Sequence, residues 1–308
     1  MKSTIECYNK VNKDCFKFIK SQETAKEKFK NKEKMIKSFL VPISFWIASK
    51  AKNKKPFIVG LGGGQGTGKT TITSIISIVL KKYFKLNIFK ISIDDFYKTK
   101  KERILLSKKV HPSLITRGVP GTHDVSSMFS FFKRAKSKNF RALKLPKFNK
   151  AIDDRYNKKL WHSIKKKPDI IIFEGWCVGA RAEKNNSLKK AINSLERNND
   201  KKLIWRKFVN QQLKLKYKKL YTQLDCLLFL KANNFRLLQQ WRLKQEKKLW
   251  LKNKRSRNNK IMNKKDVIKF MQTYQRITQN MLKHAPKYSS MILNLNRNHQ
   301  IKSVKYKL

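Results

Sequence analysis

The chain has few long hydrophobic runs. None of them approaches the ~20 residues that a membrane-spanning helix requires, and the best candidate, residues 39–48, is interrupted by Pro42. The first residues, MKSTIECYNKVNKDCFKF, lack the apolar segment of a signal peptide. These absences predict a protein with no membrane partner. Hydrophobic residues still make up 40% of the chain, which is enough for a sizeable core.

Cysteines are also few. The 308 residues include four of them, Cys7, Cys15, Cys177 and Cys226, with no C-x-x-C pair and no spacing typical of a zinc site. With neither a disulfide framework nor a metal motif, the simplest interpretation is four thiols in a reducing compartment. We therefore expect a cytoplasmic protein.

Acidic residues are scarce. The chain carries 19 Asp and Glu against 75 Lys and Arg, a formal net charge of +56. Such charge suits nucleic-acid binding, because Lys and Arg displace counterions from phosphates. However, the charge is spread along the chain, no nucleic-acid motif is visible, and Lys, Asn, Ile and Phe are all encoded by A/T-rich codons. We therefore expect no specific nucleic-acid partner, only unselective attraction of polyanions at low salt.

The most informative stretch is FIVGLGGGQGTGKTT, residues 57–71. Residues 63–70 match the phosphate-loop pattern G-x-x-x-x-G-K-[ST], in which backbone amides cradle phosphate oxygens at the start of a helix. An apolar strand precedes the loop and an amphipathic helix follows it, which is the context that the motif requires. The residues predicted to bind ATP are Gly63, Gly64, Gln65, Gly66, Thr67, Gly68, Lys69, Thr70 and Thr71.

Within the loop, Lys69 is predicted to contact the β- and γ-phosphates during catalysis, and the Thr70 hydroxyl to bind Mg²⁺. ATP and Mg²⁺ are therefore the expected cofactors. The alternative is a chance glycine-rich turn, since the pattern fixes only four positions.

Alternating apolar and helical segments predict the fold. Strands are expected at residues 57–62, 88–93, 169–173, 225–230 and 291–295, separated by helical segments that include 125–135, 187–220, 235–251 and 266–284. Residues 98–124 are expected to be irregular. This order predicts an α/β three-layer sandwich of the P-loop NTPase type with a parallel sheet. Residues 1–53 are predicted to form a basic helical extension, and residues 54–308 the main domain.

Three carboxylates follow predicted strands. Asp94 and Asp95 come directly after residues 88–93, and Glu174 ends DIIIFEG. Ligands of such sheets bind at the carboxyl ends of the strands, so Gly63, Asp94 and Glu174 are expected to share one crevice. We predict Asp94 as the catalytic base, and Glu174 and Asp95 as metal ligands with Thr70. The alternative for each is a residue that caps a turn.

A second group of residues is predicted to line the pocket of a small-molecule substrate. Arg117, His123 and Asp124 lie in RGVPGTHD, and Lys150 and Arg155 in KFNKAIDDR. A solvated loop is an equally good interpretation of these positions. Arg242 lies on a helix before the all-polar residues 252–260, so it is predicted to act in catalysis from a lid at about 236–262, the alternative being a solvated helix face.

Taken together, GGQGTGKTT, ISIDDFY, RGVPGTHD, LPKFNKAIDDR, FEGWCVGAR and WRLKQE resemble the D-glycerate 3-kinase group of P-loop kinases. That group is related to uridine kinase, phosphoribulokinase and pantothenate kinase. The resemblance extends from about residue 39 to 295. It implies transfer of a phosphoryl group from ATP to D-glycerate, with Asp94 as base and the RGVPGTHD and P-x-x-x-K segments around the acceptor.

Other functions remain open at this stage. A kinase for a nucleoside, pantothenate or a sugar phosphate shares most of these motifs. An ATP-regulated nucleic-acid-binding protein is a third hypothesis, although such a protein needs neither the EGW nor the THD motif. The sequence gives no indication of the oligomeric state.

Overall fold

Six strands form the central sheet of the computed structural model, which describes residues 2–24, 28–252 and 262–307. Their order is β10-β9-β8-β1-β7-β2, and all neighbours are parallel except β10, which is antiparallel to β9. The strands are β1 (Phe57–Gly63), β2 (Ile88–Ser92), β7 (Ile170–Gly175), β8 (Cys226–Lys231), β9 (Met291–Leu295) and β10 (Ile301–Tyr306). The predicted parallel sheet is confirmed, and β10 is an addition to it.

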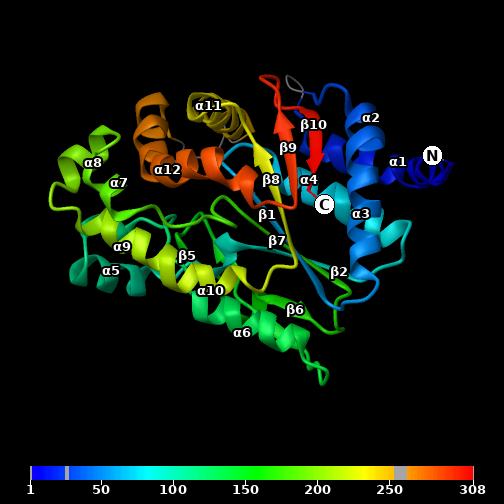
Figure 1. Ribbon diagram of the computed structural model, residues 1–308, viewed down its shortest axis with the longest axis horizontal. Coiled ribbons are helices and arrows are strands. Elements are labelled where there is room, and N and C mark those ends of the chain that lie inside the picture. The colour runs from blue at the N-terminus through cyan, green and yellow to red at the C-terminus, as the bar shows by residue number, and fades with distance from the viewer. Residues whose placement is uncertain (1, 25–27, 253–261, 308) are drawn as a thin grey trace.

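Side chains alternate along the strands between the two faces of the sheet, and each face has its own hydrophobic core. In β1, Val59 and Leu61 belong to one buried cluster, while Ile58 belongs to the other. Neighbouring side chains of a strand point to opposite faces, and both faces here are apolar because helices cover both. Figure 1 shows α3 and α4 on one side of the sheet and α6, α9 and α10 on the other. The predicted three-layer arrangement is confirmed.

The helices account for most of the remaining chain. They are α1 (Lys2–Gln22), α2 (Lys32–Met35), α3 (Val41–Ala51), α4 (Lys69–Lys82), α5 (Lys100–Lys109), α6 (Val125–Lys136), α7 (Asn185–Lys189), α8 (Ser194–Asn199), α9 (Ile204–Gln212), α10 (Lys218–Tyr221), α11 (Phe235–Lys252) and α12 (Lys264–His284). The helical stretches expected at residues 187–220 are present. That segment divides into α7 to α10, with a π-helical turn at Leu213–Tyr217.

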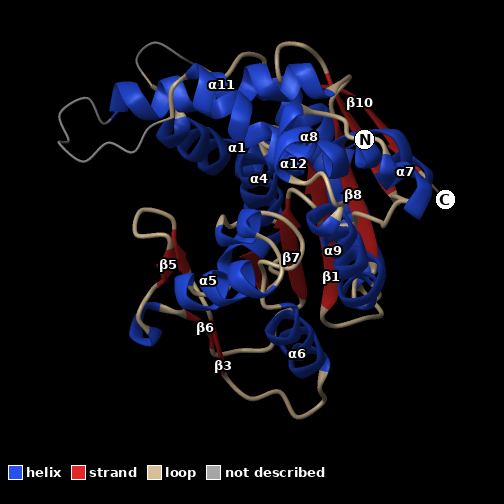
Figure 2. Ribbon diagram, turned by 90° about the vertical axis from the view of Figure 1, so that its left-hand side faces the viewer, coloured by secondary structure: helices blue, strands red, loops and turns tan. Residues whose placement is uncertain are grey.

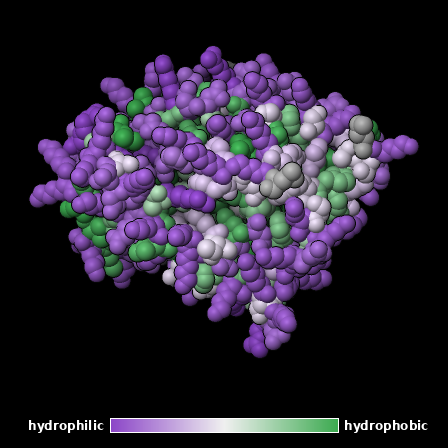
Figure 3. Space-filling model, in the orientation of Figure 1, coloured by the Kyte–Doolittle hydropathy of each residue, from purple (hydrophilic) through white to green (hydrophobic). Residues whose placement is uncertain are grey.

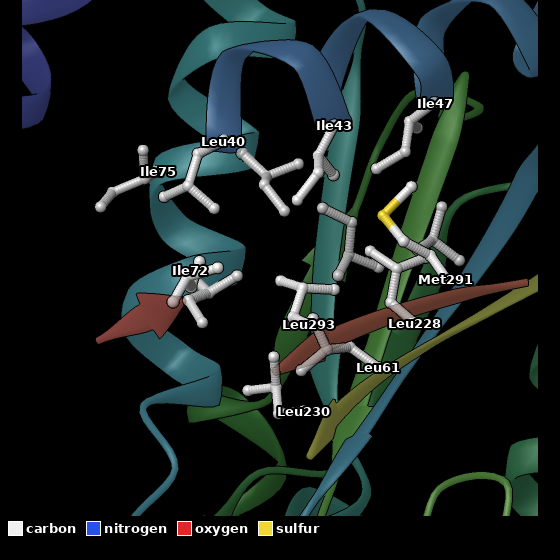
Figure 4. Packing of buried hydrophobic residues seen from close by; sticks show 14 of the residues in the cluster. Leu40, Ile43, Ile47, Leu61, Ile72, Ile75, Leu228, Leu230, Met291 and Leu293 are labelled. Carbon is white, nitrogen blue, oxygen red and sulfur yellow. The ribbon is translucent and has the colours of Figure 1, made fainter. Parts of the chain in front are cut away.

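The N-terminal helices share the first core. Cys7, Val11, Cys15 and Ile19 recur on one face of α1, and all are fully buried in the cluster that also contains Val59 of β1. Figure 4 shows Leu40, Ile43 and Ile47 packed over Leu61, Leu228 and Met291 of the sheet. The core is therefore continuous across residue 53, and the predicted domain boundary there stays a prediction.

All four cysteines are free and buried. Within the described ranges, no helix combines the length and the apolar character needed to cross a bilayer. The cytoplasmic location stays a prediction.

Two small hairpins stand beside the sheet. β3 (Leu143–Leu145) pairs with β6 (His162–Ile164), and β4 (Phe148–Asn149) pairs with β5 (Asp154–Arg155), both antiparallel. Figure 2 shows β5 near α5, on a part of the molecule away from α11. The β4–β5 hairpin carries two of the residues predicted to line the substrate pocket.

Candidate active site

The phosphate loop connects β1 to α4 in a conformation that favours glycine. Gly66 has a φ of 78° and Gly68 a φ of 84°, in the left-handed region that other residues rarely adopt. Helix α4 begins at Lys69, directly after Gly68, so its unpaired amides and the positive end of its dipole face the loop. This arrangement fits the phosphate groups of a nucleotide.

Lys69 folds back over this loop. Its ammonium donates hydrogen bonds to the carbonyl oxygens of Gly63 and Gly64, at 2.9 and 3.0 Å. Burial lowers the pKa of Lys69, and the negative charges of Glu174 and Asp94 oppose that lowering. The ammonium thus lies at the loop, where a phosphate oxygen would offer it a stronger, charge-assisted bond than a carbonyl does.

Thr70 and Glu174 form a pair of oxygen ligands beside the loop. The Thr70 hydroxyl donates to Glu174 Oε1 at 3.1 Å, because parallel pairing sets Glu174 of β7 level with Leu61 of β1. Burial raises the pKa of Glu174, while Lys69 lowers it. Hydroxyl and carboxylate oxygens suit Mg²⁺, which commonly combines one or two carboxylates with substrate phosphates and water.

The described residues contain no cluster of three or more His, Cys, Asp or Glu side chains that would enclose a metal without a nucleotide. Thr70 and Glu174 supply two oxygen donors, and Mg²⁺ commonly completes such a set with substrate phosphates and water.

Asp94 is the second residue of a 3₁₀ turn, Ile93–Phe96, directly after β2. The Ser92 side chain caps this turn by accepting a hydrogen bond from the Asp94 amide at 3.3 Å. The Asp94 carboxylate accepts from the Lys150 ammonium at 2.7 Å. Burial alone would raise the pKa of Asp94, but Lys150, His123 and Lys69 together bring it below its usual value. Asp94 is therefore an ionised carboxylate near the phosphate loop.

The neighbouring Asp95 has different partners. Its Oδ1 accepts from the Phe148 amide at 3.4 Å, and its Oδ2 lies 3.3 Å from His162 Nε2. These contacts hold β4 against the turn that carries both aspartates. The predicted role of Asp95 as a metal ligand stays a prediction, since neither contact involves Thr70 or Glu174.

Arg117 lies at the base of the β4–β5 hairpin. It forms an ion pair with Asp153, and its guanidinium lies 5.4 Å from the centre of the Phe148 ring. Asp153 also pairs with Arg103 of α5 at 2.9 Å, and the Arg103 side chain is fully buried. Sequence reasoning missed Arg103, because a single arginine carries no signal in a chain with 75 Lys and Arg.

His123 is buried next to the aspartate turn. Its Nδ1 lies 2.6 Å from the Tyr217 hydroxyl, and its ring stacks on Tyr97 with centroids 4.5 Å apart. Burial lowers the pKa of His123 to about 4, although the Asp94 charge opposes this, so the ring is neutral at pH 7. The other nitrogen, Nε2, is buried without a hydrogen-bond partner, which leaves it available to a ligand.

Asp124 and Arg155 hold structural elements together. The Asp124 side chain caps α6 by accepting from the Ser127 amide at 3.0 Å. Arg155 donates to Asp124 at 3.3 Å and to the Tyr97 carbonyl at 2.9 Å. Asp124 is therefore the N-cap of α6 rather than part of a solvated loop, and the predicted substrate contacts of both residues stay predictions.

Helix α11 packs directly on the phosphate loop. A Cβ atom at Gly66 would lie 3.1 Å from Trp241 Cβ and 3.3 Å from the Arg242 amide nitrogen. The Arg242 guanidinium pairs with Glu246 and lies 5.5 Å from the Phe270 ring of α12. Its Nε is buried without a partner. The all-polar residues 252–260 predicted to form the lid loop lie outside the described residues, except Lys252 at the end of α11.

His299 is a further residue at this loop that sequence reasoning missed. It lies in the turn between β9 and β10, where its ring stacks on Trp241 with centroids 4.4 Å apart. Its Nε2 would be 3.7 Å from a Cβ atom at Gly68. The position of His299 could not be predicted from the sequence, because strand β10, and hence the turn before it, was not expected.

The sequence of this chain is similar to those of known kinases. No protein-family model matches the chain. The uncharacterized kinase mug58 of Schizosaccharomyces pombe is 30% identical over 228 residues, which cover 71% of this chain and 79% of that protein. The chloroplastic D-glycerate 3-kinase of Arabidopsis thaliana is 26% identical over 199 residues, which cover 62% of this chain and 41% of that protein. The chain belongs to the D-glycerate 3-kinase-like family of P-loop kinases.

The fold of this kinase matches a solved relative. The structure of D-glycerate 3-kinase from Cryptococcus neoformans var. grubii superposes with a TM-score of 0.74, at 23% identity, and covers 89% of this chain and 99% of that one. A TM-score of 0.74 at 23% identity shows that the two proteins share a fold. The resemblance and the fold class expected from the sequence are both confirmed.

In this P-loop kinase, the carboxyl ends of three neighbouring strands meet as predicted. Gly63, Glu174 and Asp94 follow or end β1, β7 and β2, which are consecutive in the sheet order. The pKa of Lys69 responds to both carboxylates. The structure thus brings the phosphate loop, an oxygen pair for a cation and an ionised aspartate to one edge of the sheet.

Proposed function

We propose that this kinase transfers the γ-phosphoryl group of ATP to a hydroxyl group of D-glycerate, giving 3-phosphoglycerate and ADP. The observation that carries the proposal is the contact of the Asp94 carboxylate, at the edge of the phosphate-loop site, with the Lys150 ammonium at 2.7 Å. An acceptor with both a hydroxyl and a carboxylate suits this pair, because the aspartate can take the hydroxyl proton while the lysine binds the carboxylate.

The phosphate-binding part of the reaction belongs to the loop. Its amides and Lys69 hold the β- and γ-phosphates, and Lys69 stabilises the charge that develops on the transferred group. Thr70 and Glu174 would hold Mg²⁺, which neutralises phosphate charge when it is bound. The hydrogen bonds of Lys69 to Gly63 and Gly64 would give way to phosphate oxygens.

Proton transfer belongs to Asp94. The acceptor hydroxyl oxygen attacks the γ-phosphorus, its proton passes to the Asp94 carboxylate, and the bond from the γ-phosphorus to the β–γ bridging oxygen breaks. The low pKa of Asp94 keeps the carboxylate ionised and ready to orient the hydroxyl. The neutral His123, whose pKa is affected by the Asp94 charge and whose Nε2 has no hydrogen-bond partner, offers a further polar contact to the acceptor.

The test is kcat/KM for D-glycerate, L-glycerate, uridine, pantothenate and ribulose 5-phosphate. D-Glycerate is expected to be the best acceptor. A preference of tenfold or more for a nucleoside or pantothenate, about 1.4 kcal/mol of transition-state discrimination, would make the glycerate assignment wrong. Phosphorylation of none of the five, with ATP still bound, would also contradict it.

A further inference from the structure

The β4–β5 hairpin is fastened to the active site on several sides. The Phe148 amide of β4 donates to Asp95, and Asp153 before β5 pairs with the fully buried Arg103. On β5, Arg155 donates to the Tyr97 carbonyl at 2.9 Å. These contacts fix the backbone of the hairpin beside the turn that carries Asp94, so a side chain in the hairpin has a defined starting point.

Lys150 differs from these anchors. It follows β4 in the connection to β5, and 63% of its side chain is exposed. Its ammonium reaches 2.7 Å from Asp94, whose side chain is 28% exposed. Ion pairs that water can reach are weak and easily exchanged. The chain therefore places a solvent-exposed cation on the carboxylate that the proposed function uses as a base.

The pairing has a chemical consequence. A carboxylate oxygen that accepts a hydrogen bond from an ammonium is less basic and less free to accept a proton from a hydroxyl. An incoming carboxylate carries the same charge as Asp94 and competes with it for the Lys150 ammonium, whereas water or a neutral alcohol does not. The exchange would release Asp94 only when an anionic acceptor is present.

We propose that Lys150 is a specificity-determining residue that masks Asp94 until an anionic hydroxy acid takes over its ammonium. This inference rests on the proposed function and adds the acceptor class and its means of selection. It requires a negative charge on the acceptor and predicts that Lys150 protects ATP from water while the acceptor site is empty.

The competing reaction in the absence of an acceptor is the hydrolysis of ATP. With Asp94 unmasked and no acceptor present, a water oxygen attacks the γ-phosphorus and its proton passes to the Asp94 carboxylate. The bond to the β–γ bridging oxygen breaks, which yields ADP and inorganic phosphate. The same loop residues hold ATP in both reactions, so a change at Lys150 affects the choice of nucleophile without removing the phosphate site.

The first experiment measures ADP release without any acceptor. Lys150→Met is expected to raise this rate about tenfold, which is less than the roughly 10²- to 10⁴-fold that a general base contributes in full, and Lys150→Arg is expected to keep it low. The matched control is Lys147→Met in the same segment, whose ammonium lies 5.2 Å from the centre of the Tyr156 ring and which should hydrolyse ATP like the wild type. Adding Asp94→Asn to Lys150→Met should abolish the increase. An unchanged or lower rate in Lys150→Met overturns the proposal.

The second experiment separates this inference from the choice of acceptor. Propionate, a carboxylate without a hydroxyl, is expected to stimulate ATP hydrolysis by the wild type and to have no effect on Lys150→Met, while 1-propanol stimulates neither. These results are independent of whether D-glycerate is phosphorylated. Failure on D-glycerate with propionate stimulation intact would refute the proposed function alone. Equal responses to propionate and 1-propanol would refute the masking role.

Discussion

At the scale of single residues, Asp94 offers the sharpest test of the proposed chemistry. Asn at this position keeps the shape of the side chain but cannot accept the hydroxyl proton. We predict that Asp94→Asn lowers kcat by about 10² to 10⁴, while ATP affinity changes little because Lys69 and the loop amides are intact. Steady-state kinetics gives the first quantity and calorimetric titration with ATP the second.

Asp95→Asn is the matched control for this experiment. Its carboxylate contacts Phe148 and His162, so its loss is expected to loosen the β4–β5 hairpin and raise the acceptor KM more than it lowers kcat. Near-normal kcat in Asp94→Asn would contradict the assignment and make Asp95 the next candidate. Parallel losses of activity and ATP binding would reassign Asp94 to metal binding or structure.

Residues differ in how far the sequence reveals them. Lys69, Thr70 and Glu174 are predictable, because a short motif or the end of an apolar strand fixes their place. Arg103 and the pairing of Lys150 with Asp94 are not, since they depend on contacts between segments 50 and 56 positions apart. In so basic a chain, only the packed structure distinguishes a cation with a defined partner from a solvated one.

At the scale of elements, the five parallel strands of the sheet were predicted and the antiparallel edge strand was not. β1 is buried at every position, and such continuous apolar runs are typical of central parallel strands. The edge strand β10 is buried only at Ile301, and its lysines, typical of an edge, conceal it. Helix α5 was missed for a related reason, because its one buried residue is Arg103 and it has no apolar stripe. The Thr99–Glu102 capping box was the available signal.

The contact between α11 and the phosphate loop supports a prediction at the same scale. Gly66→Ala places a Cβ atom 3.1 Å from Trp241 Cβ and 3.3 Å from the backbone nitrogen of Arg242, at a φ of 78°. We predict a loss of about 1 to 3 kcal/mol in the free energy of unfolding and weaker ATP binding, because the backbone is strained at this φ and α11 must shift slightly at the loop. Urea denaturation and calorimetric titration measure the two effects.

Gly68→Ala provides the matched comparison. Its φ of 84° imposes similar backbone strain, but its nearest neighbour, His299 Nε2, is 3.7 Å away, an ordinary contact distance. The difference between the two variants therefore isolates the packing of α11 on the loop. If Gly68→Ala is destabilised as much as Gly66→Ala, backbone strain alone explains the loss and the packing argument fails.

At the scale of the whole molecule, a chain with a net charge of +56 folds because its charged side chains and its core side chains lie on separate faces of the helices that carry them. Helix α1 shows this division, since fully buried Cys7, Val11, Cys15 and Ile19 share one stripe while most of its lysines are exposed. On the face shown in Figure 3, hydrophilic side chains cover most of the surface rather than one stripe. The sequence predicts the amount of charge, whereas the cover of hydrophilic side chains on this face is visible only in three dimensions.

This distribution leads to the last prediction, that nucleic-acid binding is electrostatic and unselective. A diffuse cationic surface releases counterions from any polyanion, so affinity for DNA should fall steeply with salt, by about 10³-fold or more between 50 and 200 mM if six or more phosphates are contacted. Fluorescence anisotropy with two unrelated duplexes of equal length should give the same affinity at each salt concentration, and heparin should compete with both. ATP turnover should not rise when DNA or RNA is added at 200 mM salt. A sequence-specific complex that persists at that concentration, or stimulated ATP turnover, would show that the charge serves recognition and would revive the nucleic-acid hypothesis.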